Sequence, residues 1–161
     1  MVFSPKKFAA NGWQFSYLKY SDLEWFLEIR NAIRKNLHNN QEFSIIETRA
    51  WYKNGMKDNL YYVVANRIQK VGYIRIKQEI ETKKVLIGLD LHPFHHGKGF
   101  AVSIFQGASK LVDELFKPDF IYLRVLKANS VAINLYNKLG FQICNETELD
   151  LEMVININKL S

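Results

Sequence analysis

A basic turn near the middle of the chain carries the residues best suited to chemistry. Gly97 and Gly99 allow positive φ values or close approach, so successive backbone N–H groups can converge on an anion beside the start of a helix. Lys98 adds positive charge there, as do His95 and His96 when they are protonated. Two glycines before a helix are also typical of a simple tight connection. Together, the residue types predict a phosphate-binding turn.

The flanking segments would place this turn between a strand and a helix. Val85–Leu91 is almost entirely apolar without polar alternation, which is typical of a central strand covered on both faces. Pro93 cannot donate a ladder hydrogen bond, so the strand should end before it. An amphipathic run from Val102 to Phe116 predicts a helix.

Two motifs resemble those of the GNAT acyltransferases. The turn resembles motif A, written Gln/Arg-x-x-Gly-x-Gly/Ala, except that histidine takes the first position. This departure leaves the pyrophosphate contact of that side chain open, whereas the backbone contacts need only the glycines. A later stretch is similar to motif B, N-x-x-A-x-x-L-Y-x-K-x-G-F, at every key position. The motifs span His96 to Ala101 and Asn129 to Phe141, in family order, and the resemblance extends from Trp13 to the C-terminus.

The resemblance implies a GNAT fold, as one domain over residues 1–161. Its class is α/β (α+β), with a mixed, mostly antiparallel central sheet of about seven strands and with four helices. Strands 4 and 5, here Val85–Leu91 and Asp119–Lys127, would splay apart. The other strands are expected at Trp13–Tyr20, Tyr61–Asn66, Val71–Ile80, Phe141–Glu148 and Leu151–Asn158.

Two capping boxes predict where the first helices begin. Ser21 with Glu24, and Ser44 with Glu47, have the spacing in which a hydroxyl and a carboxylate satisfy each other's backbone N–H groups. Arg30 continues the apolar stripe of the first of these helices, so its guanidinium either reaches water or points into a site.

Acetyl-CoA is the coenzyme that the resemblance implies, held in the gap between the splayed strands. The backbone groups of Leu89 and Leu91 would pair with the pantetheine amides, and Gly88 could allow close approach. Asn129 would contact the coenzyme, cap the helix that it begins, or do both. The full set of expected coenzyme contacts is Leu89, Leu91, His92, His96, Gly97, Lys98, Gly99, Phe100, Ala101, Asn129, Ala132 and Tyr136.

Two side chains are expected to move protons during acyl transfer. Tyr136 falls on the inward stripe of the motif B helix, and the resemblance implies that it protonates the leaving thiolate; otherwise it is an aromatic core residue. Asp90 is the only carboxylate of the central strand, and partial burial would raise its pKa toward the range of a general base. It could instead be a solvated strand-end aspartate, with Glu79, Glu81 or a water chain taking the proton.

A metal site is not expected. His92, His95 and His96 lack an obvious carboxylate or thiolate partner and match no zinc signature, so phosphate contact or a solvated turn is the better interpretation.

The N-terminal half would build the acceptor pocket. Its Arg–Asn…Ser…Trp spacing resembles bacterial acetyltransferases of nucleotide-linked aminosugars, notably those of the pseudaminic-acid pathway, and is found more loosely among acetyltransferases of ribosomal-protein N-termini. Arginines could hold a diphosphate, and an aromatic ring could stack on the base. The expected acceptor-binding residues are Arg30, Asn31, Trp51 and Arg75.

These observations favour an N-acetyltransferase that transfers acetyl directly, in a ternary complex, to a small primary amine, with a nucleotide-linked amino-deoxysugar as the leading acceptor. Acetylation of protein or peptide N-termini is the second hypothesis. A non-catalytic acyl-CoA-binding or RNA-binding module is the third, and the intact Tyr136 and the lack of an RNP-type aromatic motif argue against it, so no nucleic-acid partner is expected.

Composition agrees with a packed domain that has an anionic partner. The formal charge is +6 with a pI near 9.3, and 48% of residues are hydrophobic. Cys144 is the only cysteine, which excludes an intrachain disulfide. We find neither a signal-peptide pattern nor an apolar run long enough for a membrane span. A cytoplasmic protein without a membrane partner is therefore expected, and the resemblance allows a homodimer.

Overall fold

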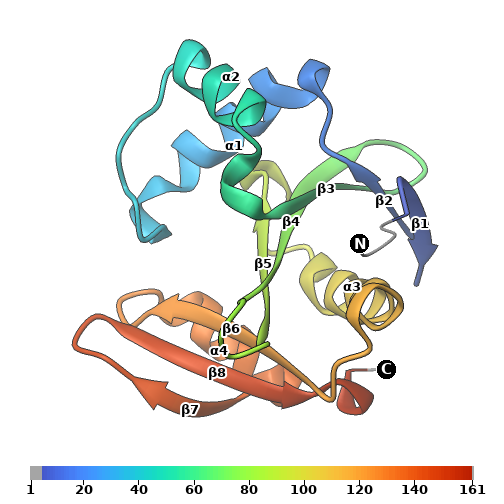
Figure 1. Ribbon diagram of the computed structural model, residues 1–161, viewed down its shortest axis with the longest axis vertical. Helices are drawn as coiled ribbons and strands as arrows, with labels where there is room; N and C mark the ends of the chain where they lie inside the picture. Colours follow the sequence, from blue (N-terminus) through green and yellow to red (C-terminus); the bar gives the residue numbers. More distant parts are fainter. Residues whose placement is uncertain (1–4, 161) are drawn as a thin grey trace.

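The computed structural model describes residues 5–160 and is shown in Figure 1. One eight-stranded sheet has the order β1-β2-β3-β4-β5-β6-β8-β7. The strands are β1 (Lys7–Ala10), β2 (Trp13–Tyr17), β3 (Leu60–Ala65), β4 (Lys70–Gln78), β5 (Val85–Leu91), β6 (Phe120–Leu126), β7 (Gln142–Glu146) and β8 (Asp150–Asn156). The helices are α1 (Leu23–Ile33), α2 (Ile45–Lys53), α3 (Phe100–Phe116) and α4 (Ser130–Leu139).

The sheet opens between its two central strands. Every other neighbouring pair is antiparallel, but β5 and β6 run parallel and pair only at Val85 with Ile121 and at Leu86 with Tyr122. By contrast, β5 pairs with β4 along its whole length. The later residues of β5 therefore have no strand partner on the β6 side, which confirms the predicted splay.

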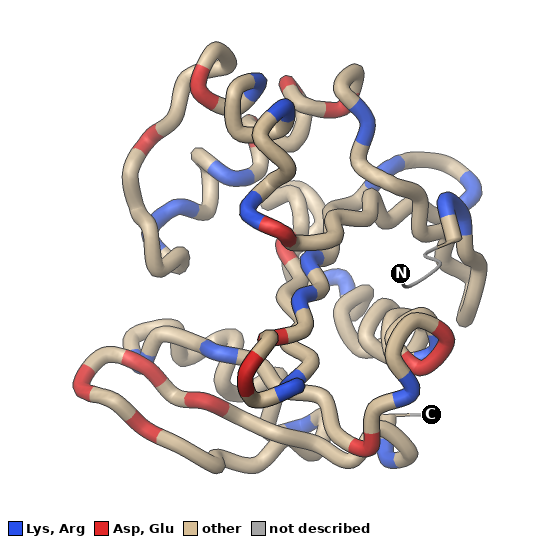
Figure 2. The backbone as a smooth tube through the Cα atoms, in the orientation of Figure 1, with Lys and Arg blue, Asp and Glu red and all other residues tan. Residues whose placement is uncertain are grey.

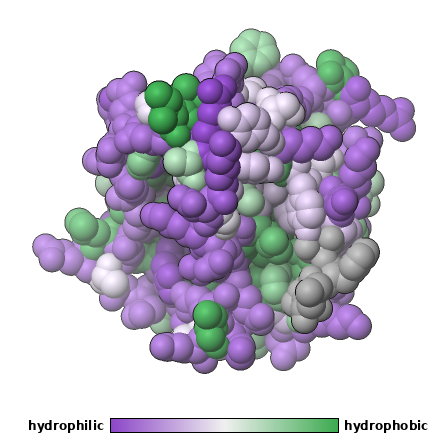
Figure 3. All heavy atoms as spheres, turned by 45° about the horizontal axis from the view of Figure 1, so that its top comes forward, coloured by the Kyte–Doolittle hydropathy of each residue, from purple (hydrophilic) through white to green (hydrophobic). Residues whose placement is uncertain are grey.

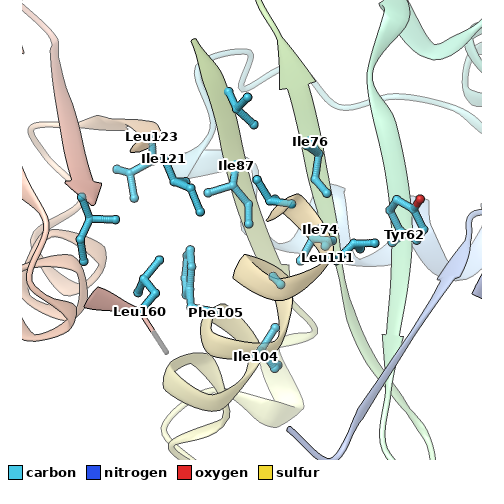
Figure 4. Close-up of a cluster of buried hydrophobic side chains, with 14 of the residues drawn as sticks. Tyr62, Ile74, Ile76, Ile87, Ile104, Phe105, Leu111, Ile121, Leu123 and Leu160 are labelled. Atoms are coloured by element: carbon cyan, nitrogen blue, oxygen red, sulfur yellow. The ribbon is translucent and has the colours of Figure 1, made fainter. Parts of the chain in front are cut away.

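Helices cover both faces of the N-terminal part of the sheet, with α1 and α2 on one face and α3 on the other (Figure 1). The α3 face holds the larger core, where each fully buried aliphatic or aromatic side chain stabilises the fold by about 1.5–3 kcal/mol. Figure 4 shows this cluster, in which Tyr62, Ile74, Ile76, Ile87, Ile121 and Leu123 from the sheet meet Ile104, Phe105 and Leu111 of α3 and Leu160.

The opposite face has a smaller aromatic core. Phe26 and Ile29 of α1 pack there against Val63 of β3 and Tyr73 of β4, and all four side chains are buried. This second core fixes α1 and α2 over β3 and β4, and it forms one wall of the site described below.

The structure contains one strand that the sequence did not lead us to expect. β1 pairs with β2 through a tight hairpin at Asn11 and Gly12, whose φ values are 53° and 81°. An Asn-Gly pair with positive φ at both positions is a strong hairpin signal, so it could have been used to predict β1. With this extra strand the sheet has eight strands, where about seven were expected.

The two predicted capping boxes have different outcomes. At α2, Ser44 Oγ accepts from the Glu47 N–H at 3.2 Å and Glu47 Oε2 accepts from the Ser44 N–H at 2.7 Å, as expected. The prediction at Ser21 is wrong, because α1 begins only at Leu23, after a short 3-10 turn. There, Asp22 Oδ2 accepts from the Lys19 N–H at 2.9 Å instead.

No helix within residues 5–160 is both long and apolar enough to cross a membrane. Cys144 is exposed on edge strand β7.

Candidate functional site

The backbone of β5 faces two directions at its C-terminal end. The His92 N–H donates to Val71 O at 2.9 Å, toward β4. Because successive residues of a strand point their backbone groups to opposite sides, the N–H and C=O groups of Leu91 and Leu89 are turned toward the splay. His96 Nε2 lies 2.9 Å from Leu91 O, so the histidine at the first position of motif A contacts the end of this exposed backbone edge.

The glycine turn that follows is open and leads into a long helix. Gly97 and Gly99 have φ values of 73° and 75°, and nothing lies within 4 Å of a Cβ built at either position. α3 begins directly afterwards and has 17 residues, so its first N–H groups point into this open turn. Lys98 is exposed, with its Nζ 4.0 Å from the centroid of the Phe94 ring. Backbone donors, a helix N-terminus and one lysine together make a site suited to phosphate.

The three histidines of the turn have different surroundings. His92 Nε2 lies 3.2 Å from Glu28 Oε1 of α1, and its Nδ1 accepts from the Phe94 N–H. His95 is only 4% exposed, and burial, followed by the charge of Lys98, lowers its pKa. His96 Nε2 contacts Leu91 O at the end of β5. Within residues 5–160, no group of three or more His, Cys, Asp or Glu side chains is arranged to hold a metal ion.

Tyr136 of α4 lies close enough to β5 for the charge of Asp90 to act on it. Its ring packs edge-on against Phe105 of α3 and Phe141, with centroids 5.7 and 5.9 Å apart. Burial raises the pKa of Tyr136, and the nearby charge of Asp90 raises it further. The phenol therefore stays protonated at neutral pH. Asn129 caps α4, since its side chain accepts from the Ala132 N–H at 3.3 Å.

Asp90 belongs to a polar group on the α1 side of the sheet. Asp90 of β5 is directly opposite Tyr73 of β4, and their side chains are hydrogen-bonded. Arg75 is directly opposite Tyr61 of β3, and these side chains are also hydrogen-bonded. Burial raises the pKa of Asp90, although the positive charge of Arg75 opposes this effect. Asp90 is thus a carboxylate whose proton affinity is enhanced, as a general base requires.

A cavity of about 430 Å³ lies over this polar group. One wall is aromatic: Phe26 stacks on Trp51 with centroids 5.2 Å apart, and Tyr61 packs edge-on against both rings. The cavity also has charged and titratable side chains, namely Arg30, His38, Glu47, Lys57, Arg75 and Asp90. Of the expected acceptor residues, Arg30, Trp51 and Arg75 are therefore brought together with Asp90.

Arg30 and Asn31 hold the loop between α1 and α2 over this cavity. The Arg30 guanidinium donates to Asn39 O at 2.9 Å and to Gln41 O at 2.8 Å, and it lies 4.1 Å from the Phe43 ring centroid. The Asn31 side chain donates to Phe43 O and accepts from the Phe43 N–H. Both side chains, expected to bind the acceptor, thus position the loop that forms one side of its cavity.

The same loop reaches across to the far end of the sheet. His38 Nε2 is 2.5 Å from Asp150 Oδ1, at the first residue of β8. His38, Tyr61 and Lys57 also line the cavity and were not among the residues expected there. His38 and Lys57 are single polar residues in loops and carry no periodic signal, whereas Tyr61 lies on the same sheet face as Arg75 and could have been found from the alternation of β3.

Comparison with known proteins agrees with this geometry. The model of the acetyltransferase (GNAT) family matches residues 23–141. The spermidine N-acetyltransferase of Vibrio cholerae, solved with CoA and spermine, superposes with a TM-score of 0.81 at 20% identity, over 94% of this chain and 99% of that one. FdhC, described as a nucleotide-linked sugar GNAT, superposes with a TM-score of 0.76 at 18% identity, over 99% of this chain and 93% of that one.

A short sequence match points to a third kind of acetyltransferase. An N-alpha-acetyltransferase of Sulfurisphaera tokodaii is 41% identical over 44 residues, which is 27% of this chain and 26% of that protein. The chain therefore spans about a quarter of the length of this curated relative. The family model covers well over half of the sequence. The chain belongs to the acetyltransferase (GNAT) family.

Proposed function

We propose that the protein is an acetyl-CoA-dependent N-acetyltransferase that acetylates a primary amine of a nucleotide-linked amino-deoxysugar. The observation that carries the proposal is the position of Asp90. It lines the acceptor cavity on one side, and its charge reaches Tyr136 on the coenzyme side. One carboxylate thus connects the place where an amine would enter with the phenol that would protonate a leaving group.

Residues around the splay fit acetyl-CoA, which supplies the acetyl thioester when bound. The unpaired backbone edge at Leu89 and Leu91 suits the amides of pantetheine, and the turn at Gly97 and Gly99 suits its pyrophosphate. His96 already contacts Leu91 O, so its side chain would exchange that contact or sit beside the bound coenzyme.

Asp90 and Tyr136 divide the proton transfers between them. The amine must be neutral to attack, and Asp90, with its raised pKa, accepts the proton that the amine loses. Tyr136 stays protonated at neutral pH and donates its hydroxyl proton to the departing sulfur. The hydrogen bond from Tyr73 and the charge of Arg75 hold the carboxylate in place between these groups.

Charge and shape support an anionic acceptor over a polyamine. The cavity contains Arg30, Arg75 and Lys57 together with Asp90 and Glu47, so its basic side chains outnumber its acidic ones. A polyamine with several ammonium groups would be repelled here. The aromatic wall could stack on a nucleotide base. We propose the cytoplasm as the site of action.

A peptide N-terminus is the second candidate acceptor. It is favoured by the local similarity to the N-alpha-acetyltransferase of Sulfurisphaera tokodaii. Residues of the loop between α1 and α2, among them His38 and Asn39, line this cavity and could contact such a chain.

The deciding experiment measures acetyl-CoA turnover, followed by product mass, on two matched panels. One panel contains UDP- and dTDP-linked aminosugars, and the other contains short peptides with free N-termini. A product confined to the aminosugars supports the proposal, whereas a peptide product moves the assignment to the second candidate. Coenzyme binding without turnover of either panel would contradict both.

A further inference from the structure

We infer that Lys57 is a specificity residue of the acceptor site, where its ammonium group binds the phosphate-bearing part of the acceptor. This inference rests on the proposed function and names a contact within the same cavity. Lys57 lies outside both motifs, in the short turn Met56–Asp58 between α2 and β3, and this exposed residue lines the cavity together with Arg75 and Asp90.

The backbone at Lys57 has an unusual conformation. Met56, Lys57 and Asp58 have φ values of 55°, 53° and 61°, and Gly55 before them has a φ of 83°. L-residues other than glycine, asparagine and aspartate rarely adopt this left-handed region, and a run of such residues is rarer still. Strained backbone persists where the surrounding structure imposes it, and it is concentrated at functional sites.

Asn59 holds this turn in place. Its Nδ2 donates to Met56 O at 3.1 Å and to Lys57 O at 3.2 Å, and Asn59 itself lines the cavity. The turn is also closed by the Asp58 N–H, which donates to Gly55 O at 3.1 Å. The chain thus fixes Lys57 at the cavity wall by a specific set of hydrogen bonds.

The other cations of the cavity already have partners. The Arg30 guanidinium binds two loop carbonyls, Arg75 is hydrogen-bonded to Tyr61 beside Asp90, and His38 is paired with Asp150. Lys57, in contrast, forms no ion pair within residues 5–160. Its ammonium is therefore available to a ligand.

The acidic side chains of the cavity are also engaged. Glu47 accepts the Ser44 N–H as part of the α2 cap, and Asp90 is bonded to Tyr73 beside Arg75. Among the described residues of the cavity, the charged side chain left without such a partner is therefore the positively charged Lys57. Figure 2 shows basic and acidic residues close together where α2 leads into β3. A phosphate group matches this charge, whereas a neutral sugar leaves it unused.

The surface of the protein does not favour a purely apolar ligand over a phosphate-bearing one. On the face shown in Figure 3, hydrophobic side chains lie singly or in small groups among hydrophilic ones. The cavity itself combines an aromatic wall with charged residues, so recognition there would use charge and hydrogen bonds as well as stacking.

The test compares two acceptors and three variants. The acceptors are a UDP-linked aminosugar and the methyl glycoside of the same aminosugar, which lacks phosphate. The Lys57→Gly variant removes the ammonium while keeping a residue suited to positive φ, Lys57→Arg keeps the charge, and Lys53→Gln is a control on α2 outside the cavity. Lys57→Gly should raise KM for the UDP acceptor about tenfold, with kcat and the KM of the glycoside unchanged. The Lys57→Arg and Lys53→Gln variants should keep KM and kcat close to the wild-type values for both acceptors.

Two results would overturn the inference while leaving the proposed function intact. The first is an unchanged KM for the UDP acceptor in Lys57→Gly, and the second is an equal rise for both acceptors. A binding measurement decides the matter separately from turnover, with UDP titrated calorimetrically into protein saturated with CoA. UDP should bind about tenfold more weakly to Lys57→Gly, and equal affinity would contradict a phosphate contact even if the wild type turned over no aminosugar.

Discussion

Arg75 of β4 lies over Gly88 of β5, directly across the strand pair. A Cβ built at Gly88 would be 3.1 Å from Arg75 Nη2, so a side chain there would require the guanidinium to shift by a few tenths of an ångström. The position that a Cβ at Gly88 would take is thus occupied from the side of Arg75, on the face of the sheet that carries the cavity. The glycine therefore helps to place a cation beside Asp90.

Replacing Gly88 by alanine should impair acceptor use rather than coenzyme binding. The new methyl group forces a small shift of the Arg75 guanidinium, which should weaken both its bond to Tyr61 and its interaction with Asp90. We expect kcat/KM for the acceptor to fall about tenfold, because a hydrogen bond to a charged group contributes about 1.5–3 kcal/mol. Steady-state kinetics with varied acceptor, alongside CoA affinity, would show this.

A double-mutant cycle with Arg75→Gln provides the control. If Gly88 acts through Arg75, the double variant should be no worse than Arg75→Gln alone. Additive losses would show that Gly88 has a separate role, such as contact with the coenzyme.

Replacing Tyr136 by phenylalanine should remove turnover and preserve coenzyme binding. The ring contacts with Phe105 and Phe141 remain, so only the proton donor is lost. Loss of a general acid typically lowers kcat by about 10²–10⁴-fold. Tyr20→Phe, at an exposed tyrosine 46% accessible to solvent, is the matched control. Near-normal kcat in Tyr136→Phe would show that another group protonates the thiolate.

The pH profile should reveal Asp90 as the base. Because burial raises its pKa, the wild-type rate should climb with pH as the carboxylate loses its proton, at a pH above the ordinary range for aspartate. Asp90→Asn should lose this rising limb and about 10²–10⁴-fold in rate. Asp113→Asn, at an exposed position on α3, should retain both. An unchanged limb in Asp90→Asn would assign the proton transfer to a different group.

The same substitution should change the free energy of unfolding in a pH-dependent way. A carboxyl whose folded pKa is raised stabilises the fold below its unfolded pKa and loses that contribution as pH rises through the folded value. Charged Asp90 therefore destabilises the protein at neutral pH. Asp90→Asn should unfold at a higher denaturant concentration than wild type at pH 7, and the difference should shrink as pH falls. A difference that grows toward acid pH would contradict the raised pKa.

The elements that position the coenzyme site could be predicted because local signals and packing agree there. The apolar run Val85–Leu91 is the β5 strand residue for residue, and the Asn129 cap of α4 is as expected. β5 is paired with β4 on one side and lies between two helical layers, so its sequence shows its environment directly.

The acceptor side was less predictable because its contacts join residues far apart in the chain. Arg30 and Asn31 were identified as important, but their bonds go to backbone atoms of residues 39–43, which no side-chain pattern reveals. Ser21 matched a capping pattern but was displaced by a 3-10 turn closed by Asp22. The positive φ values of residues 56–58 depend on the Asn59 bonds and on tertiary context, not on residue preference.

Lys57→Gly should make the protein more stable even though it weakens phosphate binding. At a φ of 53° and ψ of 41°, an L-residue carries strain of about 1–2 kcal/mol that glycine avoids, while the greater freedom of glycine in the unfolded chain offsets part of the gain. We expect the free energy of unfolding to rise by about 0.5–1 kcal/mol and Tm by about 2 °C.

Lys53→Gly provides the contrast, because it places glycine at the last residue of α2 and should lower the free energy of unfolding by about 0.5–1 kcal/mol. Thermal and urea unfolding of the three proteins would measure both effects. If Lys57→Gly is less stable than wild type, the turn is not strained and the conformational argument for Lys57 fails. If it is more stable and binds phosphate more weakly, the left-handed turn persists at a cost to stability because it holds the lysine at the acceptor cavity.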